Sequence, residues 1–254
     1  MIQSARTIAT LSVAAVVVTA ALVVYPIRGA APAPVRIGDT PVLVELFTSH
    51  GCSSCPPADQ LLSYMKNDPP LRGRVVLLAY HVDYWDQLGW KDPFSSREAT
   101  QRQGEYVRAF NLQSSYTPQA VIDGAKYMVG SDSGAVYRAV AEESGRKAEA
   151  TVRVSVKDGV AEVSGTGSGD LQLAIYEDGI TTKITRGENA GRTITNDAIV
   201  RRFTRAGHVD GKPFTKHIPL TLDPSWNRAR SGVVAFLQDS TTKRVKAVAQ
   251  SPLQ

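Results

Sequence analysis

The two cysteines of this 254-residue chain, Cys52 and Cys55, are the residues whose type and spacing point most directly to chemistry. An apolar run at residues 42–47 precedes them, and Pro56 and Pro57 follow. This order predicts a strand that leads a Cys-x-x-Cys pair into the first turn of a helix. Unpaired backbone N–H groups and the helix dipole favour a thiolate at that position. Cys52 is then the expected nucleophile, and Cys55 is the thiol that resolves a mixed disulfide by attacking Cys52.

Other roles for the same pair stay open. A purely structural disulfide is typical of exported proteins, but closing a four-residue loop stabilises by only roughly 1.9 kcal/mol, against about 3 kcal/mol for fifteen residues. Soft sulfur ligands favour Cu(I), so a copper-handling protein with Cys52, Cys55 and His81 as ligands is the second hypothesis. A non-enzymatic binding protein is the third.

Residues 1–31 are predicted to form a signal peptide or an N-terminal membrane anchor. Arg6 precedes an apolar run at residues 8–25 that is interrupted only by three Ser or Thr residues. The run exceeds a usual signal core and reaches the lower limit for a membrane span, so cleavage and retention both stay open. Both outcomes make the protein exported, either periplasmic or secreted, where disulfides persist.

Composition and charge narrow the classes of partner. A hydrophobic content of 43% indicates a globular chain, and the net charge is only +5. Basic residues are scattered apart from Arg201, Arg202 and Arg205, so no nucleic-acid partner is expected. We find no nucleotide-binding loop in the second half of the sequence and expect no cofactor. The expected partner is a protein or small-thiol substrate, together with an unknown redox partner.

The elements that must position the cysteines follow in the sequence. Residues 75–82 form a near-continuous apolar run, which is typical of a strand covered on both faces. Strand, helix and strand then form a right-handed parallel unit, and active groups gather outside the carboxyl ends of its strands. We therefore expect His81, Asp83 and Trp85 beside Cys52 as substrate-binding candidates, with Trp85 in the floor of a groove. A core histidine is the alternative for His81.

A second set of elements completes this half of the chain. A capping box from Ser95 to Glu98 predicts the start of a helix that runs to about residue 110. Pro118 marks the first residue of a strand because it cannot donate to the ladder. Asp123 and Gly124 predict a hairpin turn, and a further helix begins near residue 131.

The segment from about residue 42 to residue 146 resembles the thioredoxin fold, with GCSSC as the active-site motif. More closely, the stretches ELFTSHGCSSCPPAD, HVDYWDQLGWKDPFSSREATQRQ and YTPQAVIDG resemble a family of exported bacterial thioredoxin-like proteins that is catalogued as a domain of unknown function. This resemblance implies a thiol-disulfide role. It assigns Cys52 as the attacking thiol and Cys55 as the resolving thiol.

The resemblance also implies roles for three other residues. Thr117 and Pro118 match the threonine and cis-proline that face the cysteines. Glu45 matches the buried acid of thioredoxin but lies one residue further from the first cysteine. It is either the proton acceptor for Cys55 or a paired strand carboxylate, and both alternatives stay open.

The second half of the sequence has a different pattern. Short alternating runs between turn signals predict an antiparallel sandwich. The expected fold class is therefore an α/β thioredoxin-like domain, residues 36–147, followed by an all-β antiparallel sandwich-like domain, residues 148–254. We expect the polar segment 187–195 to be a plain surface loop, with contact to a partner as the alternative. We expect His50 to be an exposed loop histidine, with stabilisation of the Cys52 thiolate by a protonated ring as the alternative. The sulfur of Cys52 must be reachable by substrate if the redox hypothesis is right.

Overall fold

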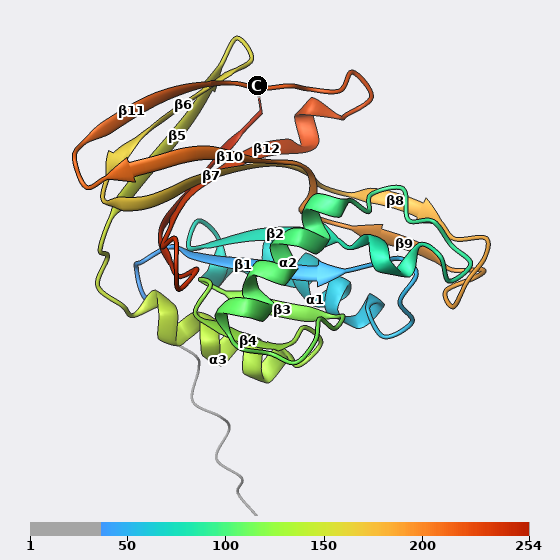
Figure 1. Ribbon diagram of the computed structural model, residues 1–254. Helices are drawn as coiled ribbons and strands as arrows, with labels where there is room; N and C mark the ends of the chain where they lie inside the picture. Colours follow the sequence, from blue (N-terminus) through green and yellow to red (C-terminus); the bar gives the residue numbers. More distant parts are fainter. Residues whose placement is uncertain (1–36, 254) are drawn as a thin grey trace, which may run out of the picture. The chain divides into compact units, whose positions relative to one another are not determined.

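A computed structural model of the protein describes residues 37–253 (Figure 1). The signal or anchor predicted for residues 1–31 lies outside the described residues. No helix in the described part of the chain is long and apolar enough to cross a membrane.

Three α-helices and three sheets lie within residues 37–253. The helices are α1 (Pro56–Asn67), α2 (Arg97–Ala109) and α3 (Ser133–Ser144). From one edge to the other, the largest sheet contains β13 (Val245–Pro252), β12 (Ser231–Gln238), β7 (Ser168–Glu177), β10 (Ile199–Asp210), β2 (Val75–His81), β1 (Val42–Thr48), β3 (Gln119–Ile122) and β4 (Lys126–Val129). A second sheet contains β11 (Phe214–Pro219), β6 (Val160–Thr166) and β5 (Thr151–Lys157), and a hairpin contains β8 (Ile180–Lys183) and β9 (Thr193–Asn196).

The largest sheet contains strands from both halves of the chain, and the predicted fold class is wrong for this reason. The outer edge of β2 pairs with β10, where Ile199 lies opposite Ala79 and the Ala79 N–H donates to the carbonyl of Ala198 (2.7 Å). Strand β10 then pairs with β7, and β7 pairs with β12. A strand edge exposes unpaired backbone groups, and here a distant segment satisfies them. The protein is thus mostly β, with one mixed sheet instead of a thioredoxin-like domain and a separate sandwich.

Strands β1 and β2 are apolar along their length because both of their faces are covered. Val44 and Leu46 pack in one cluster with side chains of α1 and α3. Leu43 and Phe47 pack on the opposite face with side chains of α2. The two strands run parallel, and their last residues, Thr48 and His81, are partners. The chain therefore leaves β1 and β2 at the same edge of the sheet.

Local signals place the helix ends. Helix α1 begins at Pro56 with Cys55 at its N-cap, and it ends before Pro69. The N-cap residue of helix α2 is Ser96, one residue after the predicted Ser95. The side chain of Ser96 accepts the capping hydrogen bond from Ala99 N–H (3.1 Å). The Ser96 cap satisfies an N–H group that has no partner inside the helix, and the prolines that open α1 lack the N–H that would need one.

The turn between β3 and β4 contains a buried carboxyl group. Asp123 Oδ1 accepts a hydrogen bond from Leu43 N–H (2.7 Å) and ties the turn to β1. Burial raises the pKa of Asp123 to about 7, and this hydrogen bond opposes the shift only in part. Glu143 raises the pKa further, whereas Arg146 and Arg244 lower it.

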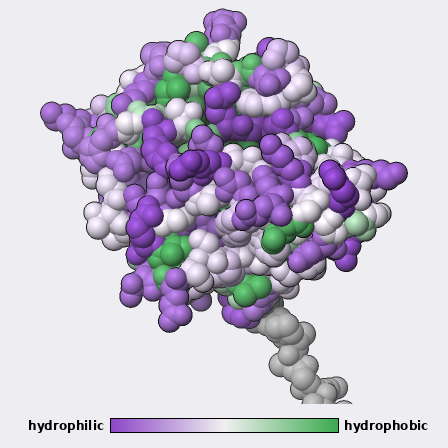
Figure 2. Space-filling view, turned by 45° about the vertical axis from the view of Figure 1, so that its right-hand side comes forward, coloured by the Kyte–Doolittle hydropathy of each residue, from purple (hydrophilic) through white to green (hydrophobic). Residues whose placement is uncertain are grey.

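The three-stranded sheet covers β7 and β12, two strands of the largest sheet that come from the second half of the chain. Leu173 and Ile175 of β7 and Ala235 of β12 belong to a cluster with Ala161 and Val163 of β6. The molecular face in Figure 2 is mostly hydrophilic, with small and separate hydrophobic areas. The apolar surface of both halves is thus largely directed inward.

Candidate functional site: a buried disulfide and a histidine cluster

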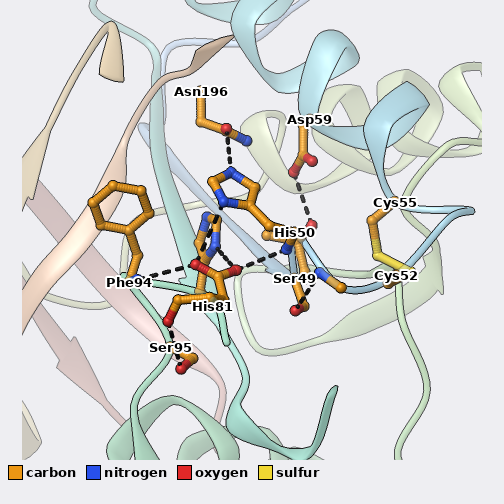
Figure 3. Close-up of polar contacts among 12 residues, drawn as sticks. Ser49, His50, Cys52, Cys55, Asp59, His81, Phe94, Ser95 and Asn196 are labelled. Atoms are coloured by element: carbon orange, nitrogen blue, oxygen red, sulfur yellow. Dashed lines mark hydrogen bonds and ion pairs between the residues drawn. A yellow bond between two sulfur atoms is a disulfide. The ribbon is translucent and has the colours of Figure 1, made fainter. Parts of the chain in front are cut away.

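Cys52 and Cys55 form a disulfide in the turn between β1 and α1 (Figure 3). The carbonyl of Cys55 accepts hydrogen bonds from Ala58 N–H (2.9 Å) and Asp59 N–H (3.1 Å), which starts the helix. Cys52 Sγ lies 3.3 Å from the hydroxyl oxygen of Ser54. When the bond is reduced, the helix N-terminus and this hydroxyl both favour a thiolate at Cys52.

Both cysteines are fully buried, at 0% exposure, so the expected access to Cys52 is not present in this state. Residues 184–192, which connect β8 to β9 and which we call the cover segment, lie against the cysteine turn. Asn189 Nδ2 donates to the carbonyl oxygens of His50 (2.9 Å) and Cys52 (2.8 Å). Glu188 Oε2 accepts from Ser53 N–H (3.0 Å). Most of the segment 187–195 is exposed, as expected of a surface loop, but Asn189 is buried and joins the segment to the cysteine turn.

Figure 1 shows the position of the β8–β9 hairpin that carries the cover segment. The β8–β9 hairpin extends past the sheet on the side where β1 ends and α1 begins. Ile184 N–H donates to the carbonyl of Arg192 (2.9 Å), which closes the base of the segment. Gly187 packs closely against Trp90. A Cβ atom added at this glycine would lie only 3.0 Å from the Cβ of Trp90. The cover segment is thus held both by the cysteine turn and by the loop that follows β2.

Trp85 connects the cysteine turn to the predicted proline. Its Nε1–H donates to Thr117 Oγ1 (2.9 Å), and a Cβ at Gly51 would lie 3.0 Å from the Trp85 Cβ. The Thr117–Pro118 peptide bond is cis, as the resemblance implied. Trp85, Thr117 and Pro118 are therefore gathered beside the turn that carries Cys52.

Asp83 and Glu45 make other contacts. Asp83 Oδ1 accepts from Thr100 Oγ1 (2.5 Å) on α2. The two carboxylate oxygens of Glu45 accept from Arg102 Nε (2.5 Å) and Nη2 (2.8 Å), and the Tyr106 hydroxyl also donates to Glu45. Glu45 is thus the paired carboxylate of the two alternatives, within a buried ion pair on the α2 face of the sheet.

A buried cluster of His50, His81 and Asp92 lies at the ends of β1 and β2 (Figure 3). His81 Nδ1 is 2.7 Å from Asp92 Oδ2, and the backbone N–H of His50 donates to the same oxygen (2.7 Å). His50 Nδ1 is 3.5 Å from Asp92 Oδ1, and His50 Nε2 is 2.8 Å from Asn196 Oδ1. The expectation that His50 is an exposed loop residue is wrong.

Burial and charge act against each other in this cluster. Burial lowers the pKa of His50, and His81 lowers it further. Burial also acts to lower the pKa of His81, but the carboxylate of Asp92 more than offsets this effect, so the pKa of His81 is raised. Burial raises the pKa of Asp59 to about 6, against the opposing effects of His81 and Thr48. The pKa values of the two histidines are thus shifted in opposite directions, and Asp92 lies closer to His81 (2.7 Å) than to His50 (3.5 Å).

Asp92, Asn196 and the contacts of Asn189 were not predicted from the sequence. Asp92 precedes a proline in a polar loop, which is the pattern of an ordinary turn residue. Asn189 follows Cys52 by 137 positions, and Asn196 follows His50 by 146. No local pattern signals contacts over such separations.

The fold and the site together define a class of protein: a mixed β-sheet protein with a Cys-x-x-Cys disulfide at the N-terminus of a helix and a buried His-Asp cluster beside it. Residues 43–238 match the family model described as "Protein of unknown function (DUF1223)", and the chain belongs to this family.

Two solved structures are similar to this chain. A protein from Agrobacterium tumefaciens, known from a crystal structure, is 30% identical, with a TM-score of 0.69 over 84% of this chain and 94% of that chain. HBP35 of Porphyromonas gingivalis is 15% identical, with a TM-score of 0.65 over 85% of this chain and 76% of that chain, which is a likeness of fold alone. A search of curated proteins found no match.

Proposed function

We propose that this protein is an exported thiol-disulfide oxidoreductase that acts through Cys52 and Cys55. The observation that carries the proposal is the disulfide between residues three positions apart at the start of α1. A loop this short stabilises by only roughly 1.9 kcal/mol, so the bond is a weak structural link. The same position favours a reactive thiolate once the bond is reduced.

In the proposed reaction a thiolate of a dithiol substrate attacks Cys52 Sγ. The bond to Cys55 breaks, and Cys55 leaves as a thiolate. The second substrate thiol then attacks the mixed disulfide and releases Cys52 as a thiolate and the substrate as a disulfide. Two electrons and two protons pass from the substrate to the protein. The same steps in reverse reduce a substrate disulfide, and a second dithiol or disulfide compound resets the pair.

Attack at Cys52 requires the cover segment to move. Its polar contacts with the cysteine turn are the two hydrogen bonds from Asn189 and the one accepted by Glu188. Breaking them exposes the turn without disrupting the main sheet, which is a local opening of the kind seen in lids over active sites. Trp85 and Thr117 then flank the place where a substrate meets Cys52. We propose a protein or small thiol as that substrate.

Export fits the same chemistry. Disulfides persist in oxidising compartments outside the cytoplasm, and residues 1–31 carry the predicted signal or anchor. The hypothesis of a copper site at Cys52, Cys55 and His81 gains no support from the geometry. The two sulfur atoms are bonded to each other in this structure and therefore do not offer thiolate ligands.

The test is a redox titration of the full-length protein in glutathione buffers, with alkylation and mass spectrometry to count free thiols. We expect a reduction potential in the range of exchange catalysts, about −120 to −270 mV, whereas structural disulfides lie below about −300 mV. The wild type should also turn over a peptide disulfide, and Cys52→Ser should abolish that turnover. A potential below about −300 mV together with no turnover would reject the proposal.

A further inference from the structure

We propose that His50, His81 and Asp92 bind one divalent transition-metal ion, with Zn²⁺ as the best match. The proposal does not depend on redox exchange at the cysteines. It starts from the arrangement of the ligand atoms: one from each residue, all within 4.8 Å of one another and all buried. Imidazole nitrogen and carboxylate oxygen at about 2.0–2.2 Å are the ligands that Zn²⁺ takes in proteins. Inward shifts of the side chains would complete the site.

The hydrogen bond of His50 determines which of its nitrogens is available. Asn196 Oδ1, an amide oxygen, can only accept, so the proton of the imidazole lies on His50 Nε2 (2.8 Å). His50 Nδ1 then carries a lone pair. It has no hydrogen-bond partner among residues 37–253, and it lies 3.5 Å from Asp92 Oδ1. Two electron-rich atoms that face each other in a buried place favour a cation between them.

The surroundings hold the ligands in place, as the partners around known metal sites do. Asn196 fixes the ring of His50 from its far nitrogen, which is the usual role of the outer hydrogen bond on a metal-bound imidazole. The backbone N–H groups of His50 (2.7 Å) and Phe94 (3.0 Å) donate to the carboxylate of Asp92. The ring of Phe94 lies edge-on to both imidazoles, with centroids 5.7 Å away. These contacts reduce the reorganisation that binding requires.

Charge and unpaired polar atoms also favour an ion. The ion would carry a charge of +2. The carboxylate of Asp92 and the nearby carboxylate of Asp59 balance this charge, and the two imidazoles bind as neutral ligands. Asp59 Oδ2, Asn196 Nδ2 and His81 Nε2 are buried without a hydrogen-bond partner in the described part of the chain. Asp59 and Asn196 both lie beside His50 in Figure 3. With three protein ligands, the fourth position on the ion would hold a water or hydroxide.

The experiment uses the full-length, oxidised protein, purified without a histidine tag, so that the cysteines are not available as ligands. After removal of metal with a chelator, Zn²⁺ binding is measured by calorimetry, and Co²⁺ serves as an optical probe. We expect one ion per chain and a visible Co²⁺ spectrum of nitrogen and oxygen ligands. Asn196→Ala should weaken Zn²⁺ binding by about 10- to 100-fold, and His50→Ala should weaken it further.

The chain supplies its own matched control. It has four histidines, and the other two, His208 and His217, lie exposed on strands of the second half. The double variant His208→Ala/His217→Ala should bind Zn²⁺ as the wild type does. Absence of stoichiometric binding by the wild type would overturn the proposal without any variant. So would loss of binding in this control, or unchanged affinity in folded His50→Ala.

Discussion

Replacing Asn189 with alanine should make the Cys52–Cys55 disulfide react faster. The side chain of Asn189 is buried, at 1% exposure, and it donates to two carbonyl groups of the cysteine turn. Alanine removes both hydrogen bonds and leaves the two carbonyl oxygens without this donor. The cover segment then loses the contacts that hold it over Cys52.

The size of the effect follows from these two bonds. A typical internal hydrogen bond contributes about 0.5–1.5 kcal/mol net, so the closed position of the cover segment should lose about 1–3 kcal/mol. Every 1.4 kcal/mol is about a factor of ten, so opening should become roughly 5- to 150-fold more favourable. If opening is fast compared with the reaction, the rate of disulfide reduction should rise by the same factor.

The assay follows the reduction of the disulfide by a small-molecule reductant, with quenching by alkylation and mass spectrometry. Arg192→Ala is the matched control, because Arg192 lies in the same segment and its exposed side chain makes no hydrogen bond in the part of the chain that the structure describes. We expect the control to react at the wild-type rate. Equal rates for the wild type and a folded Asn189→Ala would refute the role of the cover segment.

Three further predictions concern other parts of the structure. Glu45→Gln should lower the free energy of unfolding, measured in urea, by about 3–5 kcal/mol, because it leaves the guanidinium of Arg102 buried without its charge partner. A loss below about 1 kcal/mol would show that the ion pair is dispensable for stability. Asp123 has a folded pKa raised to about 7, so its ionisation destabilises the folded state. The free energy of unfolding should therefore fall by up to about 4 kcal/mol as the pH rises from about 4 to 7, and Asp123→Asn should remove this fall. The same pH dependence of stability in the variant and the wild type would contradict this prediction. Trp85→Phe removes the hydrogen bond to Thr117 but keeps a ring, and it should lower kcat/KM on a peptide disulfide about fivefold, the equivalent of about 1 kcal/mol; unchanged kcat/KM would exclude Trp85 from the substrate site.

The elements around the cysteines were predictable because their signals are local. Apolar runs gave the strands at residues 42–48 and 75–81, and two prolines after Cys55 gave the start of α1. The turn at Asp123 adopts a positive φ of 48°, which aspartate tolerates in such turns. The resemblance to a known family supplied the cis bond at Pro118. Each of these features depends on a few neighbouring residues.

The features that failed depend on contacts between distant segments. The pairing of β10 with β2 merged two expected domains, and periodicity within a strand does not reveal which edge it joins. The cover segment and His50 were expected at the surface because their sequences are polar. Most of the cover segment is exposed, but Asn189 and His50 are buried, because Asn189 donates to the carbonyl of His50 and the His50 ring is paired with Asn196.

The buried ion pair of Glu45 has a signal in the sequence. Glu45 is an acid within an otherwise apolar strand, and it required a buried partner. Arg102 and Tyr106 lie four positions apart on α2 and so share one face of that helix. An arginine on the inner face of a helix, opposite a lone acid in a strand, predicts the ion pair that the structure contains.

The central claim is that Cys52 exchanges disulfides with a substrate. The most direct measurement is to react reduced Cys55→Ser with a peptide disulfide and to map the product by mass spectrometry. We expect a stable mixed disulfide on Cys52, and we expect reduced Cys52→Ser to form far less adduct at Cys55 under the same conditions. Equal labelling of the two variants, or no adduct on Cys52 even when Asn189→Ala is added, would contradict it.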